Sequence, residues 1–212
     1  MATNSKLIIG IIGAGRLGTA IARQSLKAGH RVNISNSRGP QSLELMLGVL
    51  LPGAVAMTVN DVAQKSDIII LAMPLNKYSA LDPEWLAGKI VIDAMNYWPP
   101  TEGRIPEFMN EQVTSSQYLQ QHFDRARIVK TLNHVAYNEI EEHSLPPAHP
   151  QRRAIALAGD DDAAKKQAEQ FIDTIGFDTI DLGDLQEGSK FQPDTKLFNA
   201  RLTKAEIEQI VR

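Results

Sequence analysis

A glycine-rich stretch that directly follows an apolar run is the feature that most constrains the fold of this chain. Residues 6–12 read KLIIGII, which is typical of a strand buried on both faces of a parallel sheet. The glycine-rich stretch occupies residues 13–18, a helical pattern covers 19–28, and a second strand pattern covers 31–36. Because parallel neighbouring strands require a crossover of this kind, the unit predicts the start of a parallel β-sheet.

The same alternation of strand and helix patterns continues along the chain. Further strands are expected at residues 55–58, 67–72, 89–94, 127–132, 153–158 and 177–182, and further helices at 41–51, 61–65, 114–123, 160–175 and 203–211. This alternation predicts an α/β fold, a Rossmann-type doubly wound, mostly parallel sheet with helices on both faces. We expect one domain over residues 1–212, with its core at 6–135 and a strand–helix–strand extension at 150–212.

The composition excludes several classes of function. The 212 residues include 22 basic and 25 acidic side chains, a formal net charge of −3, and no cysteine. The negative charge argues against a nucleic acid or an anionic membrane as partner. The absence of cysteine excludes disulfides, thiolate nucleophiles and cysteine-ligated metals, and no metal site is expected. The N-terminus is unlike a secretory signal and no apolar run approaches a membrane span, so a cytoplasmic location is expected.

The glycine-rich stretch has the spacing of a phosphate-binding loop. Its residues are Gly13, Ala14, Gly15, Arg16, Leu17 and Gly18, which match the pattern GxGxxG between a strand and a helix. The first glycine permits a tight turn, the second lets backbone N–H groups approach a pyrophosphate, and the third lets the helix pack against the strand. The helix N-terminus adds partial positive charge, so the sequence predicts an NAD(P)-binding domain.

The end of the second predicted strand indicates which dinucleotide is bound. An NAD site usually has Asp or Glu there, about 20 residues beyond the loop, where the carboxylate binds the ribose 2′-hydroxyl. This chain has Asn36, Ser37 and Arg38 instead. No carboxylate is present to repel a 2′-phosphate, and the Arg38 guanidinium can bind one. The sequence therefore favours NADP(H) as the cofactor.

Several segments of the chain resemble a known reductase family. The segment IIGIIGAGRLGTAIARQSLKAGHRVNISNSRGP resembles the NADPH-dependent reductases of the deazaflavin coenzyme F420, also called NADP oxidoreductase, F420-dependent, and is similar to STEAP reductase domains. Further similar segments are LAMPLNKY, VIDAMNYWPP, RIVKTLNHV, ALAGDDDAAK and IGFDTIDLGDLQEGSKFQPDTKLFNARLT, so the resemblance extends over nearly the whole chain. The last of these segments is characteristic of bacterial dinucleotide-binding members.

The resemblance implies an NADP(H)-dependent oxidoreductase with further cofactor contacts in two loops. The loops that flank the ribose and nicotinamide in the family correspond here to Ala72, Met73, Pro74, Ala94, Met95 and Asn96. A deazaflavin co-substrate would stack near the loop after the sixth strand, residues 132–135. The implied partner is a small-molecule electron acceptor, such as a flavin or deazaflavin. A homodimer is expected by resemblance and because closed homo-oligomers are common.

The sequence does not identify a catalytic acid or base by itself. Hydride transfer between two cofactor rings needs orientation and exclusion of water more than a protein acid. Lys130 and His134 lie in and just after a predicted strand. They are the candidate proton donors in an alternative interpretation, a 3-hydroxyacid or imine reductase. A further alternative is an NADP(H)-binding redox sensor without turnover. Tyr97 and Trp98 either stack on a bound ring or anchor their loop to the sheet.

Overall fold

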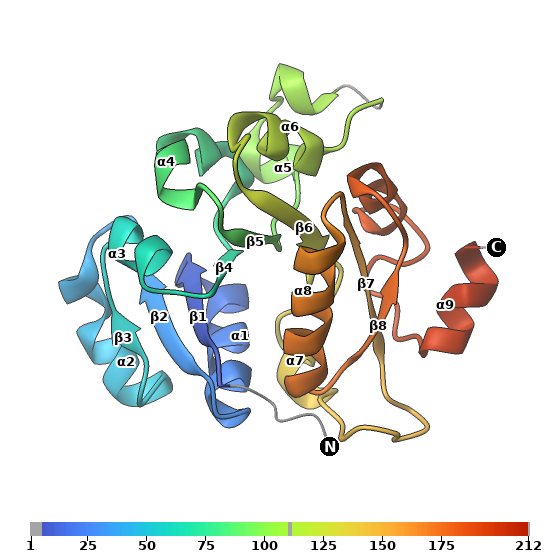
Figure 1. Ribbon diagram of the computed structural model, residues 1–212, viewed down its shortest axis with the longest axis horizontal. Helices are drawn as coiled ribbons and strands as arrows, with labels where there is room; N and C mark the ends of the chain where they lie inside the picture. Colours follow the sequence, from blue (N-terminus) through green and yellow to red (C-terminus); the bar gives the residue numbers. More distant parts are fainter. Residues whose placement is uncertain (1–5, 110–111, 212) are drawn as a thin grey trace.

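The computed structural model describes residues 6–109 and 112–211 and shows one β-sheet with helices on both faces (Figure 1). Within these residues the sheet has eight strands in the order β3-β2-β1-β4-β5-β6-β7-β8. The strands are β1 (Ile8–Ile12), β2 (Arg31–Ser35), β3 (Val55–Ala56), β4 (Ile68–Leu71), β5 (Ile90–Asp93), β6 (Arg127–Thr131), β7 (Ala154–Gly159) and β8 (Asp178–Asp181). All neighbours are parallel except β6 and β7, so the predicted doubly wound, mostly parallel fold is confirmed.

Helices cover both faces of this sheet. The α-helices are α1 (Arg16–Lys27), α2 (Glu44–Leu50), α3 (Val59–Gln64), α4 (Pro83–Leu86), α5 (Pro99–Glu102), α6 (Ser115–His122), α7 (Glu139–Glu142), α8 (Asp162–Thr174) and α9 (Lys204–Val211). Short 3-10 helices are η1 (Pro40–Leu43), η2 (Leu75–Ala80), η3 (Pro106–Met109) and η4 (Leu185–Phe191). Helices α1, α7 and α8 pack on one face, and α3, α4 and α6 pack on the other (Figure 1).

The core is built from the apolar strands that the sequence predicts. All four residues of β4 have no solvent exposure, and neither do Ile9 and Ile11 of β1. Successive side chains of a strand point to opposite faces, so Ile11 packs on the α1 side and Ile12 on the α3 side. Burying each such side chain contributes roughly 1.5–3 kcal/mol. The central strands are therefore a rigid base for the loops at their carboxyl ends.

Helix termini follow the local sequence signals in some places and not in others. The capping box of α6 is present: Thr114 Oγ1 accepts from the Gln117 N–H at 3.2 Å, and Gln117 Oε1 accepts from the Thr114 N–H at 2.8 Å. The helix expected at 41–51 is instead divided into η1 and α2. The sequence does not predict α4, α5 or α7, because a helix of four residues is too short to show apolar periodicity.

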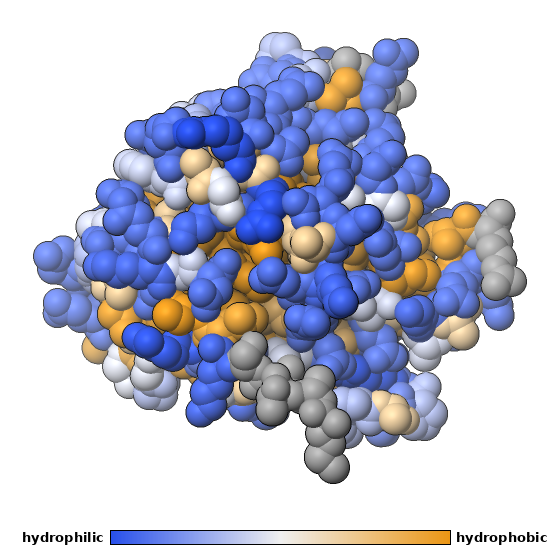
Figure 2. Space-filling model, in the orientation of Figure 1, coloured by the Kyte–Doolittle hydropathy of each residue, from blue (hydrophilic) through white to orange (hydrophobic). Residues whose placement is uncertain are grey.

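The face of the molecule drawn in Figure 2 is mainly hydrophilic. Helix α2 is an exception, since Leu45 and Val49 are 82% and 69% exposed. This helix is held to the core through its partly buried Met46 and Leu47. No helix in the described part of the chain combines the length and the apolar character needed to cross a membrane.

Candidate functional site

A cavity of about 590 Å³ opens at the carboxyl ends of β1, β2 and β4. The residues that line it are Ile12, Gly13, Ala14, Gly15, Asn36, Ser37, Arg38, Val59, Ala72, Met73, Pro74, Lys77, Ala80, Leu81 and Trp85. The strand order reverses at β1, and open α/β sheets bind their ligands in the crevice at such a reversal. The cavity thus brings together three segments that the sequence predicts to bind the dinucleotide, at residues 13–15, 36–38 and 72–74.

The glycine loop has the geometry that its spacing predicts. Gly13 has a φ angle of +118°, and a Cβ atom there would clash with the Ala72 carbonyl oxygen. A Cβ atom at Gly18 would clash with the Gly13 carbonyl oxygen, so the start of α1 lies directly against the turn. At Gly15, by contrast, an added Cβ would meet no atom within 4 Å. Two glycines are therefore required by the fold, and the third leaves open space where a phosphate can approach.

Helix α1 begins at this open space without a side-chain cap. Gly15 is its N-cap residue and offers no side chain to the first N–H groups of the helix. The partial positive end of α1 therefore lies at the cavity, where an anion such as a pyrophosphate would satisfy it. Leu17 and Gly18 lie behind this end, against the core, and are not among the residues of the cavity wall.

Arg16, the first residue of α1, extends toward the segment that follows β6. Its Nη1 donates to the Tyr137 hydroxyl at 3.3 Å, and its guanidinium carbon lies 5.4 Å from the centroid of the Tyr137 ring. Arg16 thus joins the glycine loop to the chain beyond β6. It does not line the cavity in this conformation.

The segment after β2 forms a tight turn at the cavity. Asn36 Oδ1 accepts from the Arg38 N–H at 2.9 Å, and Asn36 Nδ2 donates to Ser42 Oγ at 2.9 Å. Asn36 therefore shapes the turn, while the Arg38 side chain is exposed beside the cavity. In the described part of the chain no acidic side chain lines the cavity. This charge pattern suits a 2′-phosphate, which an acidic residue would repel.

The two loops expected at the nicotinamide differ in their access to the cavity. Residues 72–74 lie in its wall. Ala94 and Met95 are only 1% and 3% exposed, and Asn96 Nδ2 donates to the Asn133 carbonyl oxygen at 2.7 Å. The structure therefore brings the first loop to the cavity, whereas the second faces the interior and the neighbouring loop after β6.

Sequence reasoning missed one wall of the cavity, formed by η2, α4 and the residues between them. Lys77 and Ala80 lie on η2, Leu81 follows it, and Trp85 lies on α4. A 3-10 helix followed by a helix of four residues shows neither helical nor strand periodicity. The sequence does place these residues directly after β4, where the chain leaves the sheet at its ligand-binding edge, and this placement could have indicated a cavity wall.

A buried polar cluster lies at the carboxyl ends of β5 and β6. Lys130 Nζ lies 3.1 Å from Asp93 Oδ2 and also donates to the Met95 carbonyl oxygen. Asp93 Oδ2 accepts from Ser116 Oγ at 2.7 Å as well. Burial lowers the pKa of Lys130, and the neighbouring Asp93 carboxylate opposes that change. Lys130 is thus held inside the protein and is not among the residues of the cavity wall.

His134 is buried in the loop after β6. Its Nε2 accepts from the Ala156 N–H at 3.1 Å, which leaves the ring proton on Nδ1, 3.4 Å from Asn133 Oδ1. Burial and the charges of Arg153 and Lys130 lower the pKa of His134 to about 3. The histidine is therefore neutral at pH 7, and it links the loop after β6 to β7 instead of facing the cavity.

The C-terminal segment, residues 191–203, covers the loop where a deazaflavin is expected. Residues 132–135 of that loop are at most 4% exposed. The Asn199 N–H donates to the His134 carbonyl oxygen at 2.9 Å, and the Phe191 and His134 rings meet edge to face with centroids 5.0 Å apart. A flat ring cannot reach this loop while the C-terminal segment holds this position.

Tyr97 and Trp98 anchor the loop after β5. The Tyr97 hydroxyl donates to the Gly103 carbonyl oxygen at 2.9 Å and accepts from the Ile105 N–H at 2.8 Å. The Trp98 ring stacks on the Phe198 ring, with a centroid distance of 6.2 Å and an interplanar angle of 28°. Of the two roles expected for these aromatic residues, the structure shows the anchoring role, and for Trp98 the anchor is the C-terminal segment.

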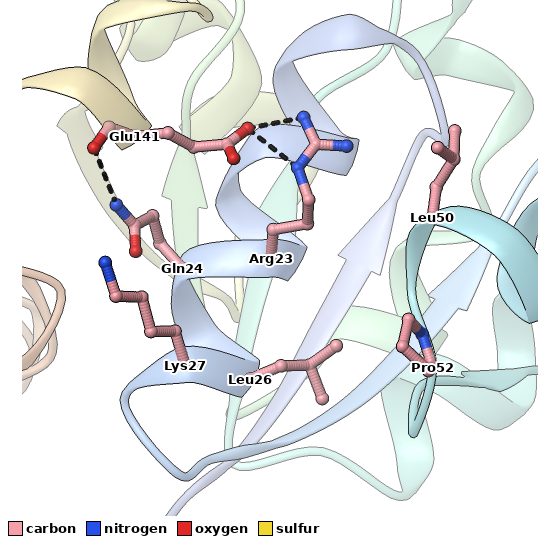
Figure 3. A pocket seen from close by; sticks show the side chains of 7 residues that line it. All are labelled: Arg23, Gln24, Leu26, Lys27, Leu50, Pro52 and Glu141. Atoms are coloured by element: carbon pink, nitrogen blue, oxygen red, sulfur yellow. Dashed lines mark hydrogen bonds and ion pairs between the residues drawn. The ribbon is translucent and has the colours of Figure 1, made fainter.

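A second hollow, of about 470 Å³, lies beside the C-terminal half of α1 (Figure 3). Its lining residues are Arg23, Gln24, Leu26, Lys27, Leu50, Pro52 and Glu141. Arg23 Nε donates to Glu141 Oε1 at 2.7 Å, and Gln24 Nε2 donates to the Ile140 carbonyl oxygen at 3.0 Å. These contacts hold α7 against α1. None of the residues that the sequence predicts to bind the dinucleotide lines this hollow.

Comparison with known proteins supports the predicted family. Residues 8–97 match the family described as NADP oxidoreductase, coenzyme F420-dependent. A glyoxylate reductase from Thermococcus kodakarensis is 37% identical over 70 residues, which make up 32% of this chain and 19% of that enzyme. The chain thus spans about a fifth of the length of this curated relative. The resemblance predicted from the sequence is confirmed over the matched residues.

Two solved structures are similar over most of their length. A hypothetical protein from Sinorhizobium meliloti is 26% identical, with a TM-score of 0.80 over 96% of this chain and 98% of that chain. A protein from Arthrobacter sp. FB24, provisionally assigned as an F420-dependent NADP reductase, is also 26% identical, with a TM-score of 0.70 over 85% of this chain and 86% of that chain. Together with the family match, these similarities support the prediction of an NADP-dependent oxidoreductase.

Proposed function

Because residues 8–97 match the F420-dependent NADP oxidoreductases, we propose that this protein transfers hydride between NADP(H) and a small acceptor, such as a flavin or deazaflavin. One observation carries the proposal. The cavity combines an open glycine loop with the turn at residues 36–38, and no acidic side chain lines its described wall. A dinucleotide with a 2′-phosphate fits this combination of open backbone and positive charge.

The chain's own residues fit NADP(H) in three places. The space over Gly15 and the uncapped start of α1 accept the pyrophosphate. The Arg38 guanidinium donates charge-assisted hydrogen bonds to the 2′-phosphate. The wall at residues 72–74 orients the nicotinamide and excludes water from one side. When bound, the nicotinamide supplies or accepts the hydride, and the protein's task is orientation.

The covered loop after β6 limits where an acceptor can approach the nicotinamide. Since residues 132–135 lie beneath the C-terminal segment, we propose that the acceptor approaches from the cavity side, next to residues 72–74. The polar atoms of Lys130 and His134 are already engaged inside the protein. Neither group is in position to protonate a substrate in the cavity, which disfavours the 3-hydroxyacid or imine reductase alternative.

A second candidate function is an NADP(H)-binding redox sensor without turnover. The observation that favours it is the burial of residues 132–135, because a protein that only holds the dinucleotide needs no room for an acceptor ring at this loop. Both candidates require NADP(H) binding, and they differ in whether the bound nicotinamide reacts. Turnover is therefore the property that distinguishes them.

The test is a calorimetric titration of the purified protein with NADPH and NADH, followed by assays of NADPH oxidation with FMN, FAD, a deazaflavin and a quinone. Preference for NADPH with turnover of one acceptor supports the oxidoreductase. Preference for NADPH without turnover of any acceptor supports the sensor. Binding of neither dinucleotide contradicts both and leaves the glycine loop a structural turn. Sedimentation of the same sample tests the expected homodimer.

A further inference from the structure

Two cations face the cavity from different walls. Arg38 follows β2, and Lys77 lies on η2; both line the cavity, and the other residues of its described wall are uncharged. Within residues 6–109 and 112–211 neither cation forms an ion pair. Two such cations around one cavity leave a concentration of positive charge that no described carboxylate neutralises.

The backbone beside Lys77 is held by Glu102, while the Lys77 side chain is exposed at the cavity. Glu102 Oε1 accepts from the Asn76 N–H at 3.0 Å, and Glu102 Oε2 accepts from the Trp98 N–H at 3.0 Å. Glu102 therefore anchors η2 through the residue next to Lys77. Its two carboxylate oxygens are engaged with backbone N–H groups and not with the Lys77 side chain.

We infer that Lys77 is a second determinant of NADP(H) specificity, which binds the adenosine 2′-phosphate together with Arg38. The inference rests on the proposed function. The pyrophosphate already has the open glycine loop and the start of α1. A phosphate monoester carries about −1.5 to −2 charges at pH 7, more than one guanidinium neutralises. An arginine fork binds two of its oxygens, and a lysine ammonium supplies a compact charge for the third.

The experiment compares three variants by calorimetric titration with NADPH and with NADH. For Lys77→Gln we expect NADPH affinity to fall about 10- to 100-fold, the range for losing a hydrogen bond to a charged group, while NADH affinity stays within about twofold. Lys77→Arg keeps the charge and should retain most of the NADPH affinity. Lys65→Gln is the matched control, because Lys65 pairs with Asp61 at 2.7 Å and does not line the cavity.

The outcomes separate this inference from the proposed function. If Lys77→Gln weakens NADPH and NADH equally, Lys77 contacts the pyrophosphate and the inference is wrong. If it weakens neither while the wild-type protein prefers NADPH, the 2′-phosphate is bound without Lys77, and the proposed function stands alone. If the wild-type protein binds neither dinucleotide, both are overturned. A thermal melt of each variant shows whether a loss of binding reflects a loss of folding.

Discussion

Lys130 and Asp93 are direct neighbours on adjacent parallel strands and form an ion pair with no solvent exposure. The two residues are register partners of β6 and β5, and Lys130 Nζ lies 3.1 Å from Asp93 Oδ2. The Met95 carbonyl oxygen and the Ser116 hydroxyl complete the cluster. The pair therefore ties the carboxyl ends of two central strands to the loop after β5 and to α6, at the edge of the sheet that carries the candidate site.

Removing the Lys130 charge should destabilise the fold strongly. Lys130→Met replaces the ammonium by an apolar group of similar length and leaves the Asp93 carboxylate buried without its cation. We expect the free energy of unfolding to fall by about 3–5 kcal/mol, which is the usual cost of leaving a buried charge unpaired. Urea unfolding followed by circular dichroism measures this change.

A second variant shows whether the cost comes from the unpaired charge. Asp93→Asn removes the opposite charge and keeps the shape of the side chain. In the double variant we expect a smaller loss than the sum of the two single losses, because neither charge is then left alone. Strict additivity of the two losses would show that Lys130 and Asp93 are not energetically coupled.

The open space over Gly15 predicts a variant that folds normally and binds the dinucleotide poorly. Gly15→Ala adds a methyl group that meets no protein atom within 4 Å, so thermal stability should be unchanged. The same methyl group would occupy the approach of the pyrophosphate, at a typical cost of about 1–3 kcal/mol for overpacking, or about 5- to 150-fold in NADPH affinity. Fluorescence titration with NADPH measures the effect.

Gly48→Ala is the matched control for the added methyl group. Gly48 lies on α2, its added Cβ also meets nothing within 4 Å, and it is not part of the cavity wall. Alanine in a helix interior is favoured over glycine by about 0.5–1 kcal/mol, so this variant should be slightly more stable and should bind NADPH like the wild type. Equal loss of affinity in both glycine variants would contradict the assignment of Gly15 to the phosphate.

The sequence predicts the strands and the glycine loop of this protein because their signals are local. A buried parallel strand is a continuous apolar run, as at β4, and the roles of Gly13 and Gly18 follow from their spacing within one strand–helix unit. The wall at η2 and α4 gives no such signal, because a 3-10 helix and a single turn have no useful period. Lys77 and Trp85 could therefore be found only in three dimensions.

The covered loop after β6 is hidden from sequence reasoning for a different reason. Its burial depends on contacts with residues far along the chain, such as the hydrogen bond from Asn133 Nδ2 to the Phe191 carbonyl oxygen, which joins residues 58 positions apart. The resemblance to the reductase family points to this loop as a place for a ring. Only the path of the C-terminal segment shows that the loop is already covered.

Burial of His134 predicts a specific dependence of stability on pH. The pKa of His134 is about 3 in the folded protein against an ordinary value of 6.5. Below pH 6.5 the unfolded chain therefore binds a proton that the folded protein does not, and stability falls as the pH falls from 6.5 toward 3. Protonation of His134 in the unfolded chain should lower the free energy of unfolding by about 1.4 kcal/mol for each pH unit within this window.

His134→Gln isolates this contribution from the titration of the carboxylates. Glutamine can still accept from the Ala156 N–H but does not titrate. Urea unfolding at pH 7, 5 and 4 should show the wild type losing stability faster than the variant as the pH falls. Parallel curves for the two proteins would mean that the histidine is solvated in the folded state.

The stack of Trp98 on Phe198 should control how firmly the C-terminal segment is docked. An aromatic pair contributes about 0.5–1.5 kcal/mol beyond its buried area, so Phe198→Ala should speed local opening of residues 191–203 about 2- to 10-fold. Hydrogen exchange of peptides from this segment measures the change, with the Asn199 amide as a direct reporter of the contact to the loop after β6. Ile210→Ala, at an exposed position of α9, is the control and should leave this exchange unchanged. If Phe198→Ala also leaves the exchange unchanged, the stack does not hold the segment, and the hydrogen bonds to the loop after β6 are sufficient to keep it closed.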